Sequence, residues 1–177
     1  NLSNGNFVAA WQSDAADNST WGISARIFNS SGSPVSGEII ANTFTSGAQI
    51  FPSVKGLSNG NFVVSWSSNG SDGNGYGIAA RGFNSSGNPI SSEFTVNSFN
   101  SGEQNAPSIE ELSNGNFIVT WRSENSDGDE YGIAARIFDS SGNVISNEFT
   151  VNSVTAASQF EPSVSNLPNG NFIITWQ

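Results

Sequence analysis

The chain has 177 residues, of which fifteen are acidic and five basic, and its formal net charge is −10; it contains no Cys, His or Met. This composition excludes disulfides, thiolate metal sites and a cysteine nucleophile. It also lacks the clustered Lys and Arg that bind phosphate backbones, so we expect no nucleic-acid partner. No apolar run reaches the roughly 18 residues of a membrane span, so we expect no membrane insertion.

In chain order, one set of elements recurs every 55 residues. The phrase Asn-Gly-Asn-Phe, followed by aliphatic residues, ends each time at a tryptophan: Trp11, Trp66, Trp121 and Trp176. Residues 1–11 are a partial repeat that supplies the second strand of a preceding blade. The full repeats are 12–66, 67–121 and 122–177, the last ending in a second strand shared with a further blade.

Four strands are predicted within each unit, as the second copy illustrates. The first strand covers 52–57, and the turn at 58–60 carries the Asn-Gly pair that marks hairpins. The second strand, 61–66, is apolar on both alternating sets, as expected for a strand covered on both faces. A Gly-rich loop at 67–75 leads to a third strand at 76–83, a tight turn at 84–87 and a fourth strand near 93–97.

The pattern predicts an all-β chain of tandem four-stranded antiparallel units with essentially no helix. These units are β-propeller blades or, alternatively, an open linear β-repeat array. Residues 1–12 and 167–177 repeat the same turn and strand, and three blades do not close a ring. We therefore expect neighbouring repeats as partners, either in a longer array, in a two-chain closed ring, or in end-to-end assembly.

Acidic loops supply the candidate metal site. The loop of the third copy contains Asp127, Asp129 and Glu130, and the second copy retains Asp72. Carboxylates interrupted by Gly can wrap oxygen ligands around Ca²⁺, the one cofactor that the sequence suggests. The alternative is a solvated turn in which Asp, Asn and Gly satisfy the backbone geometry.

Aromatic residues fall into two groups. Those that border the polar loop are candidate ligand-binding residues for glycans: Trp21, Tyr76 and Tyr131. Those that end the second strand are expected to pack between blades, with sugar stacking as the alternative: Trp11, Trp66, Trp121 and Trp176.

One arginine and one glutamate recur in each unit, and we expect them to form structural ion pairs across a hairpin. The arginines are Arg26, Arg81 and Arg136, and the glutamates are Glu38, Glu93 and Glu148. A sialidase-like arginine cluster is the alternative, but Ser126-Asp127-Gly128 lacks the intervening residue of the corresponding Ser-x-Asp box. Gln49, Gln104 and Gln159 are expected to bond the inter-blade backbone.

The surface composition, rich in Ser, Asn, Gly and Thr, is typical of secreted or cell-surface β proteins. Possible glycosylation acceptors are Asn18, Asn29, Asn69 and Asn84, each in an Asn-x-Ser/Thr sequence.

The pattern Leu-x-Asn-Gly-Asn-Phe … Asp-Gly-x-x-Tyr-Gly-Ile-x-Ala-Arg … Gln-x-x-Pro-Ser-Val covers the whole chain, with residues 14–18 departing most. It resembles the propeller-type repeats of large bacterial and cyanobacterial surface proteins, which often adjoin haemolysin-type calcium-binding repeats. The resemblance implies a non-enzymatic structural or adhesive module of an extracellular surface protein. The alternatives are a lectin-like or Ca²⁺-dependent glycan-binding propeller and a self-assembling filament subunit joined through its terminal strands. No enzymatic activity is expected.

Overall fold

The computed structural model describes residues 1–14, 17 and 20–177, and these residues form thirteen β-strands and no helix. The first sheet has the order β1-β2-β3, formed by Phe7–Asp14, Trp21–Phe28 and Ile39–Ile40. Two four-stranded sheets follow: β4 (Gln49–Gly56), β5 (Phe62–Asn69), β6 (Tyr76–Phe83) and β7 (Phe94–Thr95), then β8 (Gln104–Glu111), β9 (Phe117–Glu124), β10 (Tyr131–Phe138) and β11 (Phe149–Thr150). The last sheet pairs β12 (Ser163–Asn166) with β13 (Phe172–Thr175). Within the described residues, no helix could span a membrane.

The Asn-Gly turn between the first and second strands sets the register of each blade. In the second blade, Leu57 N donates to Asn61 O at 2.7 Å and Gly60 N donates to Leu57 O at 3.0 Å. Gly60 has a φ of 89°, a conformation that glycine adopts without steric cost. From this turn β4 and β5 run antiparallel, and Val64 of β5 faces Val54 of β4.

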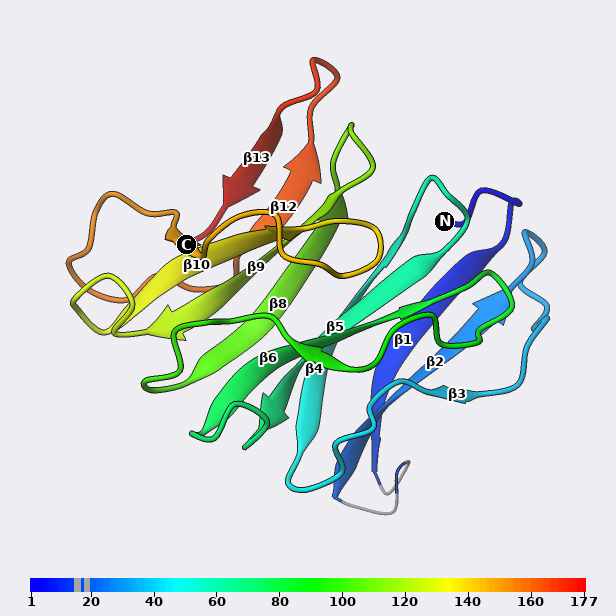
Figure 1. Cartoon of the computed structure of the whole chain (residues 1–177), viewed down its shortest axis with the longest axis horizontal. Coiled ribbons are helices and arrows are strands. Elements are labelled where there is room, and N and C mark those ends of the chain that lie inside the picture. Colours follow the sequence, from blue (N-terminus) through cyan, green and yellow to red (C-terminus); the bar gives the residue numbers. More distant parts are fainter. Residues whose placement is uncertain (15–16, 18–19) are drawn as a thin grey trace.

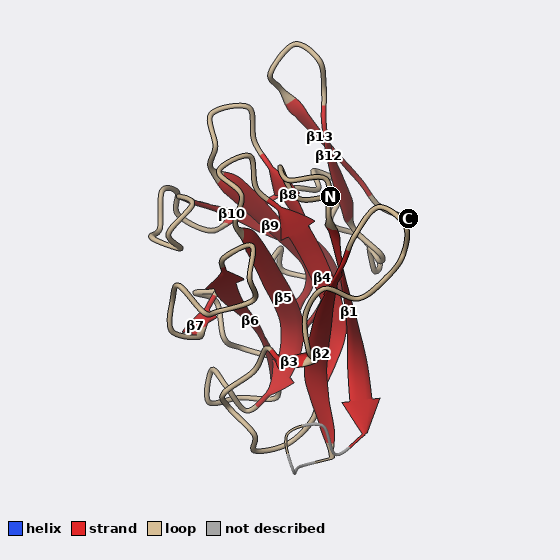
Figure 2. Ribbon diagram, turned by 90° about the vertical axis from the view of Figure 1, so that its right-hand side faces the viewer, coloured by secondary structure: helices blue, strands red, loops and turns tan. Residues whose placement is uncertain are grey.

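The sheets pack face to face as propeller blades, which confirms the predicted fold class. One apolar cluster joins Ile23 and Ile27 of the first sheet to Phe62 and Trp66 of the second. A second cluster joins Leu57 and the second sheet to Phe117 and Trp121 of the third. The first strands β4, β8 and β12 lie next to one another (Figure 1). In the second sheet, the short strand β7 lies at the edge opposite β4 (Figure 2).

The repeated tryptophans confirm the packing prediction where a blade lies on each side. Trp66 and Trp121 are completely buried between successive sheets. Trp11 is half-buried. Trp176 is 42% exposed, contrary to the prediction of a buried strand end, because no sheet in the described part of the chain covers that face of β13.

The predicted Arg–Glu ion pair across the hairpin is wrong, although both residues link blades. Arg81 donates from Nη1 to Ala41 O of the preceding blade at 3.2 Å and from Nε to Ser91 O. Glu93 instead accepts from the main chain and hydroxyl of Thr43. Instead of pairing with each other, the two side chains bond groups of the preceding blade that are two residues apart in sequence, Ala41 and Thr43.

The third blade repeats this separation. Arg136 donates to Val96 O and Ser146 O, while Glu148 accepts from Ser98 and Phe99. In the first blade Arg26 bonds Ser36 O, and Glu38 is exposed.

Candidate functional site

Two of the loop carboxylates proposed as calcium ligands, Asp72 and Asp127, belong to a polar network inside their blades. Asn97 is 5% exposed; its Oδ1 accepts from Ile78 N at 2.8 Å, and its Nδ2 donates to Asp72 Oδ2 at 2.8 Å and Gln104 Oε1 at 3.2 Å. The Asp72 carboxylate also lies over Gly77, where an added Cβ would meet it at 2.7 Å. This requirement for glycine explains why Gly follows the loop tyrosine.

The third copy directs its loop acids to separate partners. Asp127 accepts from Asn152 Nδ2 at 2.6 Å, Asp129 accepts from Ala157 N, and Glu130 accepts from a serine hydroxyl. No group of three or more acidic side chains converges among the described residues. The present donor set therefore does not fit a calcium site, and calcium binding stays a prediction of the sequence.

The repeated glutamines bond main-chain carbonyls as predicted, and these carbonyls lie in the loop that connects two blades. Gln49 Nε2 donates to Ser46 O and Gly47 O, and Gln104 does the same one repeat later. Gln159 Nε2 bonds Ala157 O, but its Oε1 is buried without a partner.

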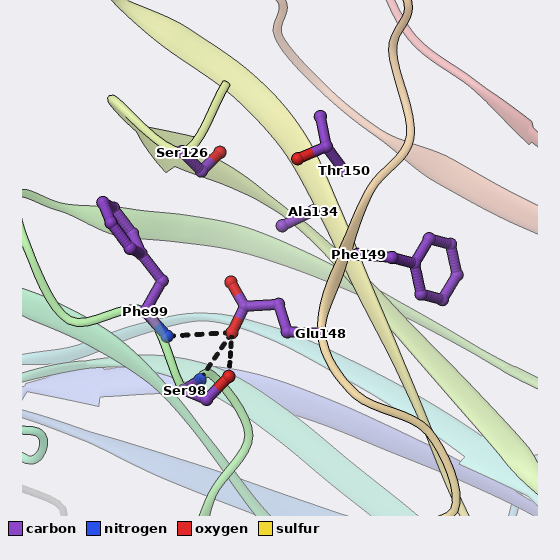
Figure 3. Close-up of a pocket in the computed structure, with 7 residues that line it drawn as sticks. All are labelled: Ser98, Phe99, Ser126, Ala134, Glu148, Phe149 and Thr150. Atoms are coloured by element: carbon purple, nitrogen blue, oxygen red, sulfur yellow. Dashed lines mark hydrogen bonds between the residues drawn. The ribbon is translucent and has the colours of Figure 1, made fainter. Parts of the chain in front are cut away.

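A pocket of about 220 Å³ lies where the third blade meets the second. Glu148 extends into it, and its Oε2 accepts from Ser98 N, Ser98 Oγ and Phe99 N (Figure 3). An equivalent pocket of about 200 Å³ surrounds Glu93 one repeat earlier. Because the same carboxylate joins blades in both places, we assign these pockets to blade docking.

The first strands β4, β8 and β12, called the inner strands below, have an unusual backbone conformation near their N-terminal ends. Phe51, Ala106 and Glu161 occupy equivalent positions and have φ values of 55°, 55° and 52°. Bulges interrupt the ladders of β4 and β8 at this point, between Ile50 and Ser53 and between Asn105 and Ser108. A bulge redirects a side chain, and such left-handed non-glycine residues cost about 1–3 kcal/mol each and cluster at functional sites.

These strained positions present different side chains. Phe51 is 53% exposed. Glu161 is exposed, and its carboxylate makes no hydrogen bond or ion pair within the described residues. The structure therefore places an aromatic ring at this position in the second sheet and a free carboxylate at the entry of the last sheet.

Beside Glu161, the third blade carries an aromatic and cationic stack. The Arg122 guanidinium lies 4.6 Å from the Tyr131 ring centroid and 5.4 Å from that of Phe160, and the two rings are 5.9 Å apart. Glu124 faces Tyr131 across the β9–β10 ladder, so the two side chains share a face. Glu124 Oε2 accepts from Glu103 N at 2.9 Å.

The structure brings only one of the three predicted ligand-binding aromatics, Tyr131, into this candidate site. Trp21 is 41% exposed and Tyr76 is half-buried, each in its own blade. Sequence reasoning missed Arg122, Phe160 and Glu161. Their signal was a departure from the repeat, since equivalent positions carry Ser67, Asn105 and Ala106 in the second copy.

The possible glycosylation acceptors lie in turns and strand ends. Asn29 and Asn84 are half-buried, and their Oδ1 atoms accept two main-chain N–H groups each within the turn. Asn69 is exposed at the end of β5. Asn18 lies outside the described residues.

No protein-family model and no curated protein matches this chain. Solved structures do match. An endo-arabinase from Bacteroides thetaiotaomicron is 17% identical with a TM-score of 0.60, covering 97% of this chain and 66% of its own. A protein of unknown function from Dyadobacter fermentans is 12% identical with a TM-score of 0.67, covering 99% and 59%. An α-L-arabinanase from Penicillium chrysogenum, complexed with arabinobiose, is 15% identical with a TM-score of 0.63, covering 97% and 53%.

The chain thus spans between about half and two thirds of these neighbours' lengths. At such identities the likeness shows the fold alone. Nevertheless, named neighbours of this fold are glycan-cleaving enzymes. This finding contradicts the prediction of a non-enzymatic structural or adhesive module, with its lectin and filament alternatives, and the expectation that no enzyme is involved.

Proposed function

We propose that this chain is part of a β-propeller glycoside hydrolase that acts on arabinose-containing polysaccharides, with its catalytic site beside the third blade. The observation that carries the proposal is Glu161, an exposed carboxylate at the entry of an inner strand that is unpaired among the described residues. The arabinanase and endo-arabinase names of the neighbours supply the substrate class.

Glycoside hydrolysis ordinarily requires two carboxyl groups on either side of the scissile bond. We assign them to Glu161 and Glu124. Glu124 shares a face with Tyr131, whose ring contacts Phe160, the neighbour of Glu161 in sequence. The two rings between these elements provide an apolar surface on which a sugar ring can lie.

Glu110 is a poor alternative partner for Glu161, although it also lies on an inner strand. It forms an ion pair with Lys55 and is only 15% exposed. It is four residues beyond the position equivalent to Glu161, which corresponds to about 13 Å along a strand. That separation exceeds the roughly 5–9.5 Å between carboxyl groups in glycosidases.

The test is release of reducing sugar from linear arabinan by the chain and by its Glu161→Gln and Glu124→Gln variants. Each variant should lower kcat by about 10²–10⁴-fold, the usual contribution of a catalytic acid or base. Thermal unfolding followed by circular dichroism must show that the variants fold.

The matched control is Glu110→Gln, which removes the same charge from an inner strand and should leave kcat unchanged. The proposal is overturned if the folded wild-type chain releases no reducing sugar from arabinan. It is also overturned if Glu110→Gln abolishes activity while Glu161→Gln preserves it.

A further inference from the structure

The Arg122 guanidinium is the exception among the five basic side chains. Lys55 pairs with a glutamate, and Arg26, Arg81 and Arg136 donate to main-chain carbonyls. The Arg122 side chain makes no hydrogen bond or ion pair in the part of the chain that the structure describes. Its Nε is buried without a partner. In a chain with fifteen acidic residues, an unpaired cation is an unexpected arrangement.

Two aromatic rings hold this guanidinium in place. Tyr131 and Phe160 lie on different elements, and both rings are within 5.4 Å of its central carbon. Gln159 N donates to Tyr131 O at 2.7 Å, which fixes the Phe160 segment against β10. Cation–π contacts of this kind position the planar group without neutralising its charge. The side chain is therefore ordered but retains its charge and its terminal donors.

The repeat shows that Arg122 does not serve the structural purpose of its equivalents. Gln12 Oε1 accepts from Phe51 N at 3.0 Å, and Ser67 Oγ accepts from Ala106 N at 3.1 Å. Each contact satisfies the strained bulge of the following blade. Arginine has donors only, so Arg122 cannot accept the corresponding hydrogen bond. The substitution gives up a structural contact that the other two blades retain.

No nearby carboxylate forms an ion pair with the Arg122 guanidinium among the described residues. Glu124 is two residues along the same strand, but its Oε2 accepts from Glu103 N, and it forms no ion pair with Arg122. Glu161 follows Phe160 directly and is likewise unpaired. The site thus combines one free planar cation with carboxylates that can accept hydroxyl hydrogens.

We propose that Arg122 binds the carboxylate of a uronosyl residue, so that the site recognises acidic sugars attached to the glycan. This inference rests on the proposed glycan-cleaving function and specifies a substrate substituent for the same site. The two terminal nitrogens of a guanidinium match the two oxygens of a carboxylate, whereas an ammonium group offers no planar fork. Tyr131 and Phe160 contact the sugar ring, and Glu124 accepts from its hydroxyl groups.

The experiment compares methyl glucuronoside with methyl glucoside, its neutral analogue, in titrations of the full chain followed by NMR. The wild-type chain should bind the uronoside at least 10-fold more tightly. Arg122→Gln should abolish this preference, and Arg122→Lys should retain only part of it. Lys55→Gln, which removes the same charge elsewhere, should keep the full preference. Thermal unfolding of each variant establishes that it folds.

The inference is overturned by equal binding of both glycosides by the wild type, by an unchanged preference in Arg122→Gln, or by loss of the preference in folded Lys55→Gln. Acetate distinguishes a sugar site from a site for any carboxylate, because equal competition by acetate would reject the uronosyl assignment. Arabinan hydrolysis is measured on the same samples. Hydrolysis without uronoside preference rejects only this inference, whereas uronoside preference without hydrolysis rejects only the proposed activity.

Discussion

Replacing Asn97 by Asp is the sharpest perturbation of the polar network that organises each blade. The change preserves shape but replaces the Nδ2 donor by an acceptor that faces Asp72 Oδ2, formerly 2.8 Å away. Phe99 O and Gln104 Oε1, the other two acceptors of that donor, then also face an oxygen. The variant should be strongly destabilised at neutral pH, because two carboxylates meet in a buried site.

The structure sets the size of the effect. Two unit charges at 2.8 Å repel by about 6 kcal/mol at an effective dielectric constant near 20. Keeping the introduced carboxyl protonated at pH 7, against an ordinary pKa near 3.9, costs about 4 kcal/mol. Protonation of the introduced carboxyl costs less free energy than the charge repulsion. We therefore expect the free energy of unfolding to fall by about 4 kcal/mol at pH 7. Unmet hydrogen bonds add roughly 1–3 kcal/mol.

The sign of the pH dependence follows from the raised folded-state pKa of the introduced carboxyl. Protonation then favours the folded state, so the deficit relative to wild type should shrink by about 4 kcal/mol as the pH falls from 7 to 4. Urea unfolding followed by tryptophan fluorescence at both pH values measures this deficit.

Two further substitutions serve as controls in the same assay. Asn97→Ala removes the donor without adding charge, so its cost should be the same at both pH values. Asn152→Asp places a carboxyl beside Asp127 in the third blade, where no glutamine Oε1 accepts from the asparagine. It should show the same pH dependence with a smaller residual cost at pH 4. A pH-independent deficit in Asn97→Asp would refute the reasoning.

Three other predictions concern single residues of the repeats. Trp66→Ala should destabilise by about 3–5 kcal/mol in urea unfolding, whereas Trp176→Ala, at an exposed equivalent position, should cost less than about 1 kcal/mol; equal losses would contradict the packing assignment. Glu148→Ala leaves two main-chain N–H groups and one hydroxyl without their acceptor, so the melting temperature should fall by several degrees; an unchanged value would show that this contact does not hold the blades together. The side-chain and main-chain hydrogen bonds from Asn143 lower the pKa of Asp139, so its stabilisation is present at neutral pH and is lost as the pH falls through the lowered folded-state pKa. Asp139→Asn, which reproduces the residue of the other blades, should therefore remove this acid-range dependence from urea titrations, and an unaltered pH profile would exclude Asp139 as its source.

The blades could be predicted because each local signal in the sequence agrees with the packing. Phe62, Val64 and Trp66 alternate with Val63 along β5, and the structure places the two sets in different inter-blade clusters. The Asn-Gly turn fixed the register because glycine alone readily adopts φ near 89° at Gly60. The apolar residues on both alternating sets therefore predicted that β5 is buried on both faces.

The polar contacts between blades could not be predicted in the same way. Glu93 reaches Thr43, fifty residues earlier, and Arg81 reaches Ala41, forty residues earlier. Pairing of residues that face each other across a hairpin applies within one sheet, so it gives no information about contacts with the adjacent sheet. The sequence-based Arg–Glu pair was wrong for that reason. Asp72 likewise bonds a buried asparagine 25 residues further on, a contact that the spacing within the loop does not indicate.

The candidate site arises where the repeat keeps its backbone and changes its side chains. Phe51, Ala106 and Glu161 share one left-handed conformation, so the strain belongs to the blade and not to a particular activity. Because the backbone is held by the surrounding ladder, the exposed side chain at this position can change without refolding the unit. The third copy places a free carboxylate at this position, Glu161, and carries the unpaired Arg122 on β9, where the other copies have a hydrogen-bond acceptor. Two such changes on neighbouring elements convert a structural bulge into a place where charge is available to a ligand.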